Sequence, residues 1–525
     1  MARVWIFFLL AAAAFAQTPQ AVRKSIDRAL PPLQRSAATF VKERACFSCH
    51  HNALAILTMR MAKQRGVPID EAVLAVVEEK TWKSGGALDE VVQARNVADP
   101  TPNDSLLLIA EEFAGRGLEP ASQVRRQRLA SWQREDGHWV TSDFRPPHSS
   151  SLFTTTATAV RALRARPGDP RVAAAASWLA TNKPVSTEDA SFRVMGLVWA
   201  GADAKAAQAD LLAMQRPDGG WGQLSGYASD AYSTGQAVFA LQAAGTAAPK
   251  GVRFLLSNQA GDGTWHVRTR MLSPAEVSPP YFETGFPYKK DQFLSYAGSA
   301  WATMALLSTI PASAPPLPVA TRIEPSVDSL SPYAQLLAAA SYYGNSTAVA
   351  KLLAAGAPAN PPEGTRGRNT PLSLAAMSGD LEMLRLLLKA GADPDSGSAL
   401  SEAVTFGHAP AVHELIAAGA DASGVEGTGI NLMHWATITN RAEVIPMLAA
   451  AKVPLDDVDD NGYTPLMYAA TIDFGDTKTL EALLAAGADI QVRDTKNRTP
   501  LQQAKRLKHA AIEKALRAKS TPERR

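Results

Sequence analysis

Cysteine is nearly absent from this sequence of 525 residues, which contains only Cys46 and Cys49. So low a content excludes a fold stapled by several disulfides, because such folds need many paired cysteines in a short chain. The two cysteines stand three residues apart, so any chemistry they perform is that of one local pair.

Long apolar runs are absent beyond the start of the chain. The opening "MARVWIFFLLAAAAFA" has one Arg, an apolar run and a final Ala-Phe-Ala, which is the pattern that signal peptidase cleaves. This run is shorter than the roughly 20 residues that span a bilayer, and no later segment replaces it. We therefore expect residues 1–16 to be a signal peptide and the mature protein to be exported, periplasmic or extracellular, without a membrane span.

A charge excess and strand-like patterning are missing too. The 53 basic residues nearly balance the 50 acidic ones, so the composition favours neither a nucleic acid nor an anionic membrane as partner. Apolar residues recur with a helical period almost throughout, which predicts an all-α fold.

Proline concentrates between Pro311 and Pro332, where six of 22 residues are proline. Such a stretch is typical of a semi-rigid spacer. It divides the chain into an N-terminal segment (17–49), a helical domain (50–310), a linker (311–331) and a second helical domain (332–520).

The second domain repeats itself. Copies begin with Thr-Pro-Leu, as in "NTPLSLAAMSGDLEMLRLLLKAGADPD" and "YTPLMYAATIDFGDTKTLEALLAAGADIQ", and corresponding positions follow at spacings of 28, 33, 33 and 35 residues. These positions are Pro371, Ala399, Leu432, Pro465 and Pro500. The pattern closely resembles the ankyrin repeat, which implies about six stacked units and a concave face that binds a partner protein. We expect Gly391 and Gly487 to end helices in the left-handed conformation.

An acidic run, Asp457-Val458-Asp459-Asp460, imitates two functional motifs. It spells the Asp-x-Asp-Asp acid motif of proton-initiated terpene cyclases and the first half of a calcium loop. The calcium pattern fails because its twelfth position is Tyr468 instead of a bidentate Glu. The acidic run precedes the Thr-Pro-Leu start of an ankyrin unit, so we expect only a solvated loop there.

The first domain carries its own motif, Gln-x-x-Asp-Gly-x-Trp, three times. The copies span Gln133 to Trp139, Gln215 to Trp221 and Gln259 to Trp265, at spacings of 82 and 44. A unit that lacks the motif is expected between the first two copies, around Trp178 to Trp199. Asp-Gly favours a turn with positive φ, and we expect the Gln amide to cap the next helix and stack on the Trp.

This motif resembles the QW motif of squalene and hopene cyclases, and the resemblance implies an α/α toroid over residues 50–310. The cyclase acid, the Asp-rich magnesium motif and the zinc ligands of related enzymes have no match in this region. We therefore expect no cyclase or prenyltransferase activity.

A central cavity of the toroid could still hold an apolar small molecule. Polar residues at the expected starts of inner helices are the candidates to line it: Tyr227, Asp230, Tyr232, Glu283, Tyr288, Lys289 and Asp291. Helix capping and satisfaction of loop backbone are the alternative role for these residues.

The strongest chemical signal is Cys46-Phe47-Ser48-Cys49-His50. This is the Cys-x-x-Cys-His pattern of c-type haem attachment, in which two thiols bond the haem vinyl groups and the histidine binds iron. Cys46 and Cys49 would anchor the haem and His50 would be the axial iron ligand. A disulfide, a zinc site and a pair without function are the alternatives.

The sequence does not identify the second axial ligand of the iron. Candidates are His51, Met59, Met61, His138, His148 and His266, and the site could equally lack a second protein ligand. Three functions follow: a redox or haem-sensing scaffold with an ankyrin docking face, a structural interaction protein with a CxxC disulfide, or an enzyme acting on an isoprenoid or other apolar molecule.

Overall fold

The computed structural model describes residues 18–43, 49–84, 88–93, 99–116, 119–142, 146–147, 151–163, 169–270, 283–312, 330–340, 345–365, 369–425 and 428–520. The described residues are mostly helical, and their one sheet pairs two short strands, β1 (Trp221–Gly222) and β2 (Ser229–Asp230). The prediction of an all-α chain is confirmed. Among the described helices, none combines the length and the apolar character that a membrane crossing requires.

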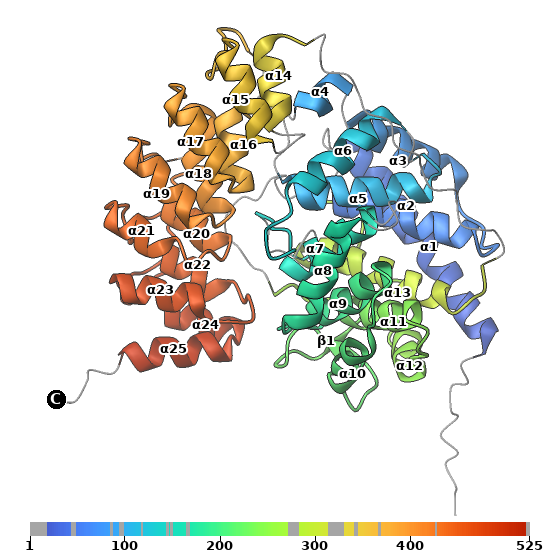
Figure 1. Cartoon of the computed structure of the whole chain (residues 1–525). Helices are drawn as coiled ribbons and strands as arrows, with labels where there is room; N and C mark the ends of the chain where they lie inside the picture. The colour runs from blue at the N-terminus through green and yellow to red at the C-terminus, as the bar shows by residue number, and fades with distance from the viewer. Residues whose placement is uncertain are drawn as a thin grey trace, which may run out of the picture.

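Six helices of the N-terminal half pack in a closed ring, each against the next and the last against the first (Figure 1). These inner helices are α2 (Cys49–Lys63), α5 (Pro100–Phe113), α7 (Leu152–Leu163), α9 (Thr187–Trp199), α11 (Ala231–Ala243) and α13 (Gln292–Ser308). Small residues permit the close approach of neighbours. A Cβ at Gly235 of α11, for example, would lie 2.6 Å from the backbone of Ala302 in α13.

A second set of helices surrounds this ring. These outer helices are α1 (Pro19–Glu43), α3 (Glu71–Ser84), α6 (Pro120–Ser131), α8 (Pro170–Thr181), α10 (Lys205–Ala213) and α12 (Pro249–Ser257). Outer and inner helices alternate along the chain, so every inner helix runs in the same direction. We call the end of the ring at which the inner helices begin the mouth.

The C-terminal half is a row of six helix pairs. The first helices of the pairs are α14 (Pro332–Ala338), α16 (Pro371–Ser378), α18 (Ala399–Thr405), α20 (Leu432–Ile438), α22 (Pro465–Thr471) and α24 (Pro500–Leu507). The second helices are α15 (Ser346–Ala354), α17 (Leu381–Lys389), α19 (Ala409–Ala417), α21 (Ile445–Ala450), α23 (Lys478–Ala486) and α25 (Ala510–Ser520). From α16 to α24, each first helix packs on the next one, which builds a stack.

The Thr-Pro-Leu sequences explain where the first helices begin. The hydroxyls of Thr370, Thr464 and Thr499 accept a hydrogen bond from the backbone N–H three residues later, and proline occupies the next position. Both features favour a helix start, because proline has no N–H to leave unsatisfied there. Gly391 and Gly487 follow the second helices at φ of 86° and 101°, as predicted.

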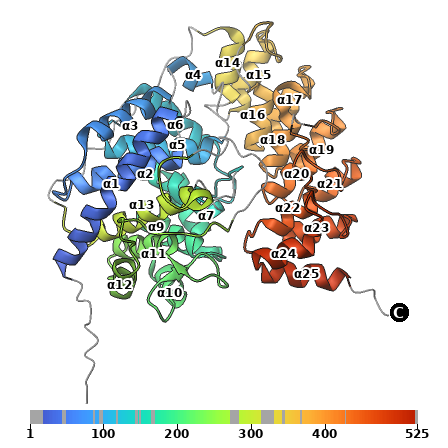
Figure 2. The same ribbon diagram turned by 180° about the vertical axis from the view of Figure 1, so that it is seen from behind.

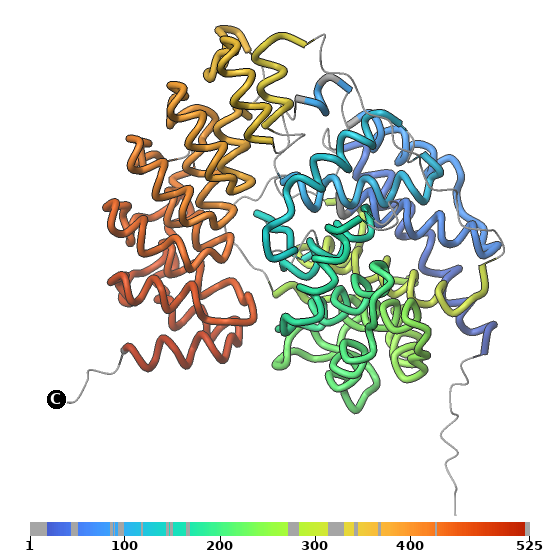
Figure 3. The backbone as a smooth tube through the Cα atoms, in the orientation of Figure 1, coloured from blue at the N-terminus to red at the C-terminus, as the bar shows by residue number. Residues whose placement is uncertain are grey.

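The stack lies along one side of the ring (Figure 2). A short helix, α4 (Leu88–Gln93), packs on both α6 and α14 and so joins the two parts at one end. The tube in Figure 3 shows the pairs of the stack following one another beside the ring. One apolar cluster continues from Leu129 and Trp139 of the ring part into Leu336 and Leu372 of the stack.

Candidate functional site

The Cys-x-x-Cys-His pattern ends in an inner helix. Cys46 lies outside the described residues, whereas Cys49 and His50 form the start of α2. The last two residues of the pattern therefore lie at the mouth of the ring. Within the described ranges, no group of three or more His, Cys, Asp or Glu side chains could hold a metal ion.

His51, one candidate for the second iron ligand, is fully buried in a stack of rings. Its imidazole lies 4.5 Å from the Phe40 ring and 3.7 Å from the Tyr296 ring, with small interplanar angles. Its Nε2 is 3.4 Å from the hydroxyl of Ser36. These contacts join α1, α2 and α13, so His51 packs the ring together in the observed conformation.

The other described candidate ligands pack in the apolar cores or form hydrogen bonds within the protein. Met59 and Met61 belong to the apolar cores on either side of α2. His138 Nδ1 lies 2.5 Å from Asp136 Oδ1, and burial lowers the pKa of this imidazole. His266 Nε2 lies 2.9 Å from Asp291 Oδ2. His148 lies outside the described residues.

The three Gln-x-x-Asp-Gly-x-Trp motifs adopt one geometry. Each Trp is buried and its indole N–H donates to the carbonyl ten residues earlier, at 2.6 to 2.9 Å. Each Gln amide donates to the motif glycine's carbonyl, at 2.8 or 2.9 Å. The three glycines, Gly137, Gly219 and Gly263, have φ of 103°, 85° and 89°. The positive φ was predicted, but the Gln amide bonds its own loop and does not cap the next helix.

The first and third motifs also form hydrogen bonds with the outer helix that follows them around the ring. Gln133 donates to the carbonyl of Arg171 in α8, at 2.7 Å. Gln259 donates to the carbonyl of Ser25 in α1, at 2.9 Å, and accepts from the Ser25 hydroxyl at 2.8 Å. The third motif therefore closes the ring by binding the first helix of the chain.

A small cavity lies at the centre of the ring. Its wall includes a residue from every inner helix: Leu54, Leu106, Thr154, Glu188, Tyr232 and Trp301. Its volume is about 30 Å³, which is room for about two water molecules. The Tyr232 hydroxyl donates to Glu188 Oε1 at 2.9 Å, and burial together with this carboxylate raises the pKa of Tyr232.

Of the predicted cavity residues, the structure places Tyr232 in this wall. Asp230 instead caps α11, where its carboxylate accepts from the backbone N–H of Ser233 at 2.8 Å. Burial raises the pKa of Asp230, and the hydrogen bonds it accepts oppose that shift. The Tyr227 hydroxyl donates to Asp473 Oδ2 of the stack at 3.2 Å.

The remaining predicted residues lie on the connection to α13. Asp291 accepts from the backbone N–H of Thr269 at 3.1 Å, and Tyr288 Oη lies 2.8 Å from the hydroxyl of Thr264. Lys289 and Glu283 are exposed. These side chains organise a loop at the mouth and do not meet in one pocket.

The sequence reasoning missed Glu188, although a signal for its position exists. Ser186 and Asp189 form a capping box, in which the serine hydroxyl accepts from the Asp189 N–H and the aspartate accepts from the Ser186 N–H. A Ser-x-x-Asp pattern before an apolar run predicts a helix start, so it places Glu188 in the first turn of an inner helix.

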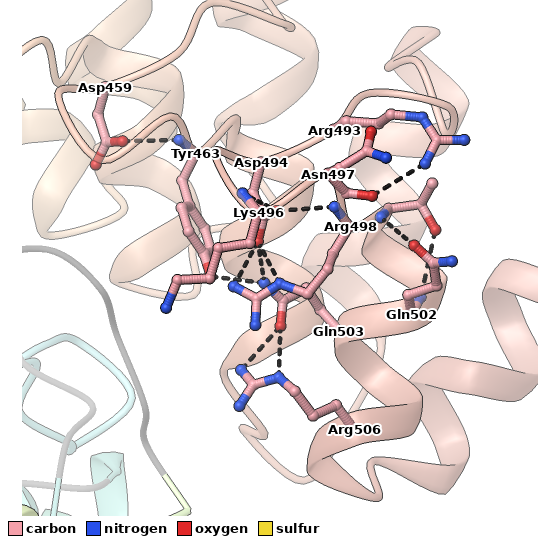
Figure 4. Close-up of polar contacts among 11 residues, drawn as sticks. Asp459, Tyr463, Arg493, Asp494, Lys496, Asn497, Arg498, Gln502, Gln503 and Arg506 are labelled. Atoms are coloured by element: carbon pink, nitrogen blue, oxygen red, sulfur yellow. Dashed lines mark hydrogen bonds and ion pairs between the residues drawn. The ribbon is translucent and has the colours of Figure 1, made fainter.

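The acidic run of the stack has a structural role (Figure 4). Asp459 Oδ1 accepts from the backbone N–H groups of Asn461 and Tyr463, and Asp494 binds Lys496 and Arg498 in the same way one unit later. Asp457 and Asp460 are exposed, but Asp459 is buried, so the prediction of a solvated loop is wrong for Asp459.

A polar network extends from Asp494 (Figure 4). Its Oδ2 accepts from the Gln503 amide at 2.6 Å, and the same amide donates to the Tyr463 hydroxyl at 2.7 Å. Burial raises the pKa of Asp494, but the hydrogen bonds from Arg498 and Lys496 outweigh burial and lower it overall. The network ties the last two units together.

The comparison with protein families finds a match in the stack. A family model described as three copies of ankyrin repeats matches residues 326–398 and 400–494. The chain is 33% identical over 104 residues to the palmitoyltransferase Hip14 of Drosophila melanogaster, covering 19% of this chain and 16% of that protein. It is 33% identical over 154 residues to the ankyrin repeat and KH domain-containing protein mask-1 of Caenorhabditis elegans, covering 28% and 6%.

A third relative is the palmitoyltransferase AKR1 of Lachancea kluyveri, which is 31% identical over 158 residues. This match covers 27% of the chain and 21% of the relative. The chain therefore spans about a fifth or less of these relatives. The C-terminal region of the chain contains ankyrin repeats.

Proposed function

We propose that the protein is an exported scaffold with two parts. The ring resembles the cyclase-like α/α toroid and carries a c-type haem at the start of α2, and the ankyrin stack binds a partner protein. The haem gives the protein a redox or sensing role. The observation that carries the proposal is the Cys-x-x-Cys-His pattern, whose last two residues begin an inner helix, in a chain with a signal-like first segment.

The toroid part of the proposal rests on repeated geometry. Three motif loops repeat the same indole and amide hydrogen bonds, and six inner helices close on themselves. The helix pair α8 and α9 occupies the place of the unit without a motif.

The donor set fits a covalent haem. Cys46 and Cys49 would form the two thioether bonds, and the adjacent His50 would bind the iron, whose redox chemistry the haem supplies. His51, Met59 and Met61 are held in the interior packing, so they support the ring instead of binding the iron.

An apolar substrate gains little support from the ring. The central cavity of about 30 Å³ holds about two water molecules, whereas an isoprenoid needs room for many carbon atoms. The CxxC disulfide remains the alternative to the haem, and one experiment distinguishes them.

The test is expression of the full chain together with a cytochrome c maturation system, followed by a haem stain on a denaturing gel. The stained band should survive boiling in the wild type and vanish in Cys46→Ala/Cys49→Ala. Ser48→Ala is the matched control, because it alters the same segment without removing a ligand, and it should stain normally.

Two results would count against the haem. A wild type that stays unstained while mature protein accumulates would overturn the proposal. Thiols that react with an alkylating agent only after reduction would then indicate the disulfide. Sequencing of the mature N-terminus tests export independently, with Gln17 expected as the first residue.

A further inference from the structure

Several polar contacts between the ring part and the stack come from loops at the mouth of the ring. Arg134, in the first motif, donates to the carbonyl of Ser378 at 3.0 Å. Tyr227 and Arg270, on the loops before α11 and α13, donate to the carboxylate and the carbonyl of Asp473. The carbonyl of Thr141, on the loop before α7, accepts from Arg441.

On the stack, these contacts share a place as well. Ser378 ends α16, Arg441 lies between α20 and α21, and Asp473 lies between α22 and α23. All are in turns that join the two helices of one ankyrin unit. We call this side of the stack the turn edge, and it spans several units along the ring.

The fit between mouth and turn edge is close. A Cβ at Gly475 would lie 2.9 Å from Val185 and 3.0 Å from Leu224, which stand before α9 and α11. Arg441 is buried, and it also donates to the carbonyl of Thr405 at 2.9 Å. Burial lowers the pKa of Arg441 to about 10, so it remains charged at neutral pH.

We propose that the ankyrin stack acts as a lid on the mouth of the ring. The closed position covers the described mouth residues Thr141, Val185, Leu224, Tyr227 and Arg270. A molecule that approaches the ring from the mouth competes with the turn edge, and a partner that binds the turn edge uncovers the mouth. Because binding at the mouth and binding at the turn edge both require the ring and the stack to separate, each binding event favours the other. The inference stands whether or not α2 carries a haem.

Hydrogen–deuterium exchange of the full chain tests the lid. Gly475→Leu places a side chain against Val185 and Leu224 and should hold the lid open. Amides of residues 223–234 should then exchange at least about fivefold faster, the change expected from the loss of one ordinary hydrogen bond. Gly487→Leu is the matched control, because Gly487 also has positive φ but has no neighbour within 4 Å of its Cβ position.

Equal exchange at residues 223–234 in Gly475→Leu and Gly487→Leu would overturn the proposal. If Gly475→Leu unfolds the stack, Tyr227→Phe provides the measurement from the ring side, since it removes only the hydroxyl that binds Asp473. If the amides of residues 223–234 then exchange in Tyr227→Phe at the wild-type rate, the lid proposal is overturned.

Discussion

At the scale of single residues, burial of histidine is the most consequential feature of the stack. His408 is almost fully buried in the turn between α18 and α19, and its Nε2 lies 2.8 Å from the carbonyl of Met377. Burial lowers its pKa to about 3, and the nearby positive charges of Arg134 and Arg441 add to this effect. The imidazole is therefore neutral at physiological pH, next to the contact between stack and ring.

The stability of the protein should fall on mild acidification because of His408. Its pKa in the folded state lies below the unfolded value of about 6.5, so the unfolded chain takes up the proton first. The stabilisation is full above pH 6.5 and decreases as the pH drops toward 3. Between pH 7 and pH 5 we expect a loss of about 2 kcal/mol from this residue.

Urea unfolding at the two pH values measures this loss. His408→Gln removes the titrating group, so the difference between pH 7 and pH 5 should shrink by about that amount. Burial also lowers the pKa of His434 and His509, so part of the pH dependence should persist. An unchanged pH dependence in His408→Gln would contradict the assignment.

Residue types in a motif predict backbone better than they predict partners. The Asp-Gly pairs of the three motif loops correctly indicate positive φ, because few residues other than glycine adopt it. The role of the motif glutamine was not predictable, since an amide can donate or accept at many nearby groups. Its actual partners are main-chain carbonyls, and every residue offers one of these.

At the scale of elements, the motif loops fasten neighbouring helix pairs. Gly263 shows why the sequence keeps glycine there: a Cβ would overlap the carbonyl of Arg28 in α1, and φ is +89°. Gly137 and Gly219 meet the backbone of α8 and α12 in the same manner. The glycine thus serves both the turn and the close approach of the next outer helix.

Gly263→Ala should destabilise the ring by about 3 kcal/mol, through backbone strain and the clash with α1. Gly261→Ala in the same loop is the control, because no atom lies within 4 Å of its Cβ position, and we expect a change near zero. Thermal or urea unfolding followed by tryptophan fluorescence measures both. Equal stability of the two variants would show that the third motif does not hold α1.

Periodicity predicts helices and repeats well in this chain, because both depend on local sequence. The ankyrin repeats were identified from their Thr-Pro-Leu starts and spacing, and the structure and the comparisons confirm them. The cavity was less predictable. Which side chains point inward depends on how each helix is rotated in the ring, so Tyr232 lines the wall while Asp230, two residues earlier, caps the helix.

At the scale of the whole molecule, the contact between ring and stack could not be read from the sequence. It uses the carbonyls of Ser378, Thr141 and Asp473, and these groups leave no signature in residue identity. Long linkers suggest independent domains, but the apolar cluster continues from one part into the other. The two parts should therefore unfold as coupled units.

Arg441→Met should uncouple the unfolding of the ring part from the unfolding of the stack. The substitution leaves the carbonyls of Thr141 and Thr405 without this donor, at a cost of about 1 to 3 kcal/mol for each buried group. Trp435 is the one tryptophan between residues 332 and 520, so fluorescence of a Trp435→Phe background reports on the ring. Loss of ring fluorescence and loss of helical circular dichroism should coincide in urea before the substitution and separate after it. Coincident transitions in Arg441→Met would show that the contact contributes little.

The bond between Ser25 and Gln259 has a consequence for the order in which the protein can mature. The two residues are separated by 234 positions, so α1 leaves the ribosome long before its partners α12 and α13 exist. The earliest helix is thus among the last of the ring to reach its final place, and formation of such distant contacts slows folding. Until α13, which ends at Ser308, has been synthesised, the ring stays open next to α1 and the start of α2.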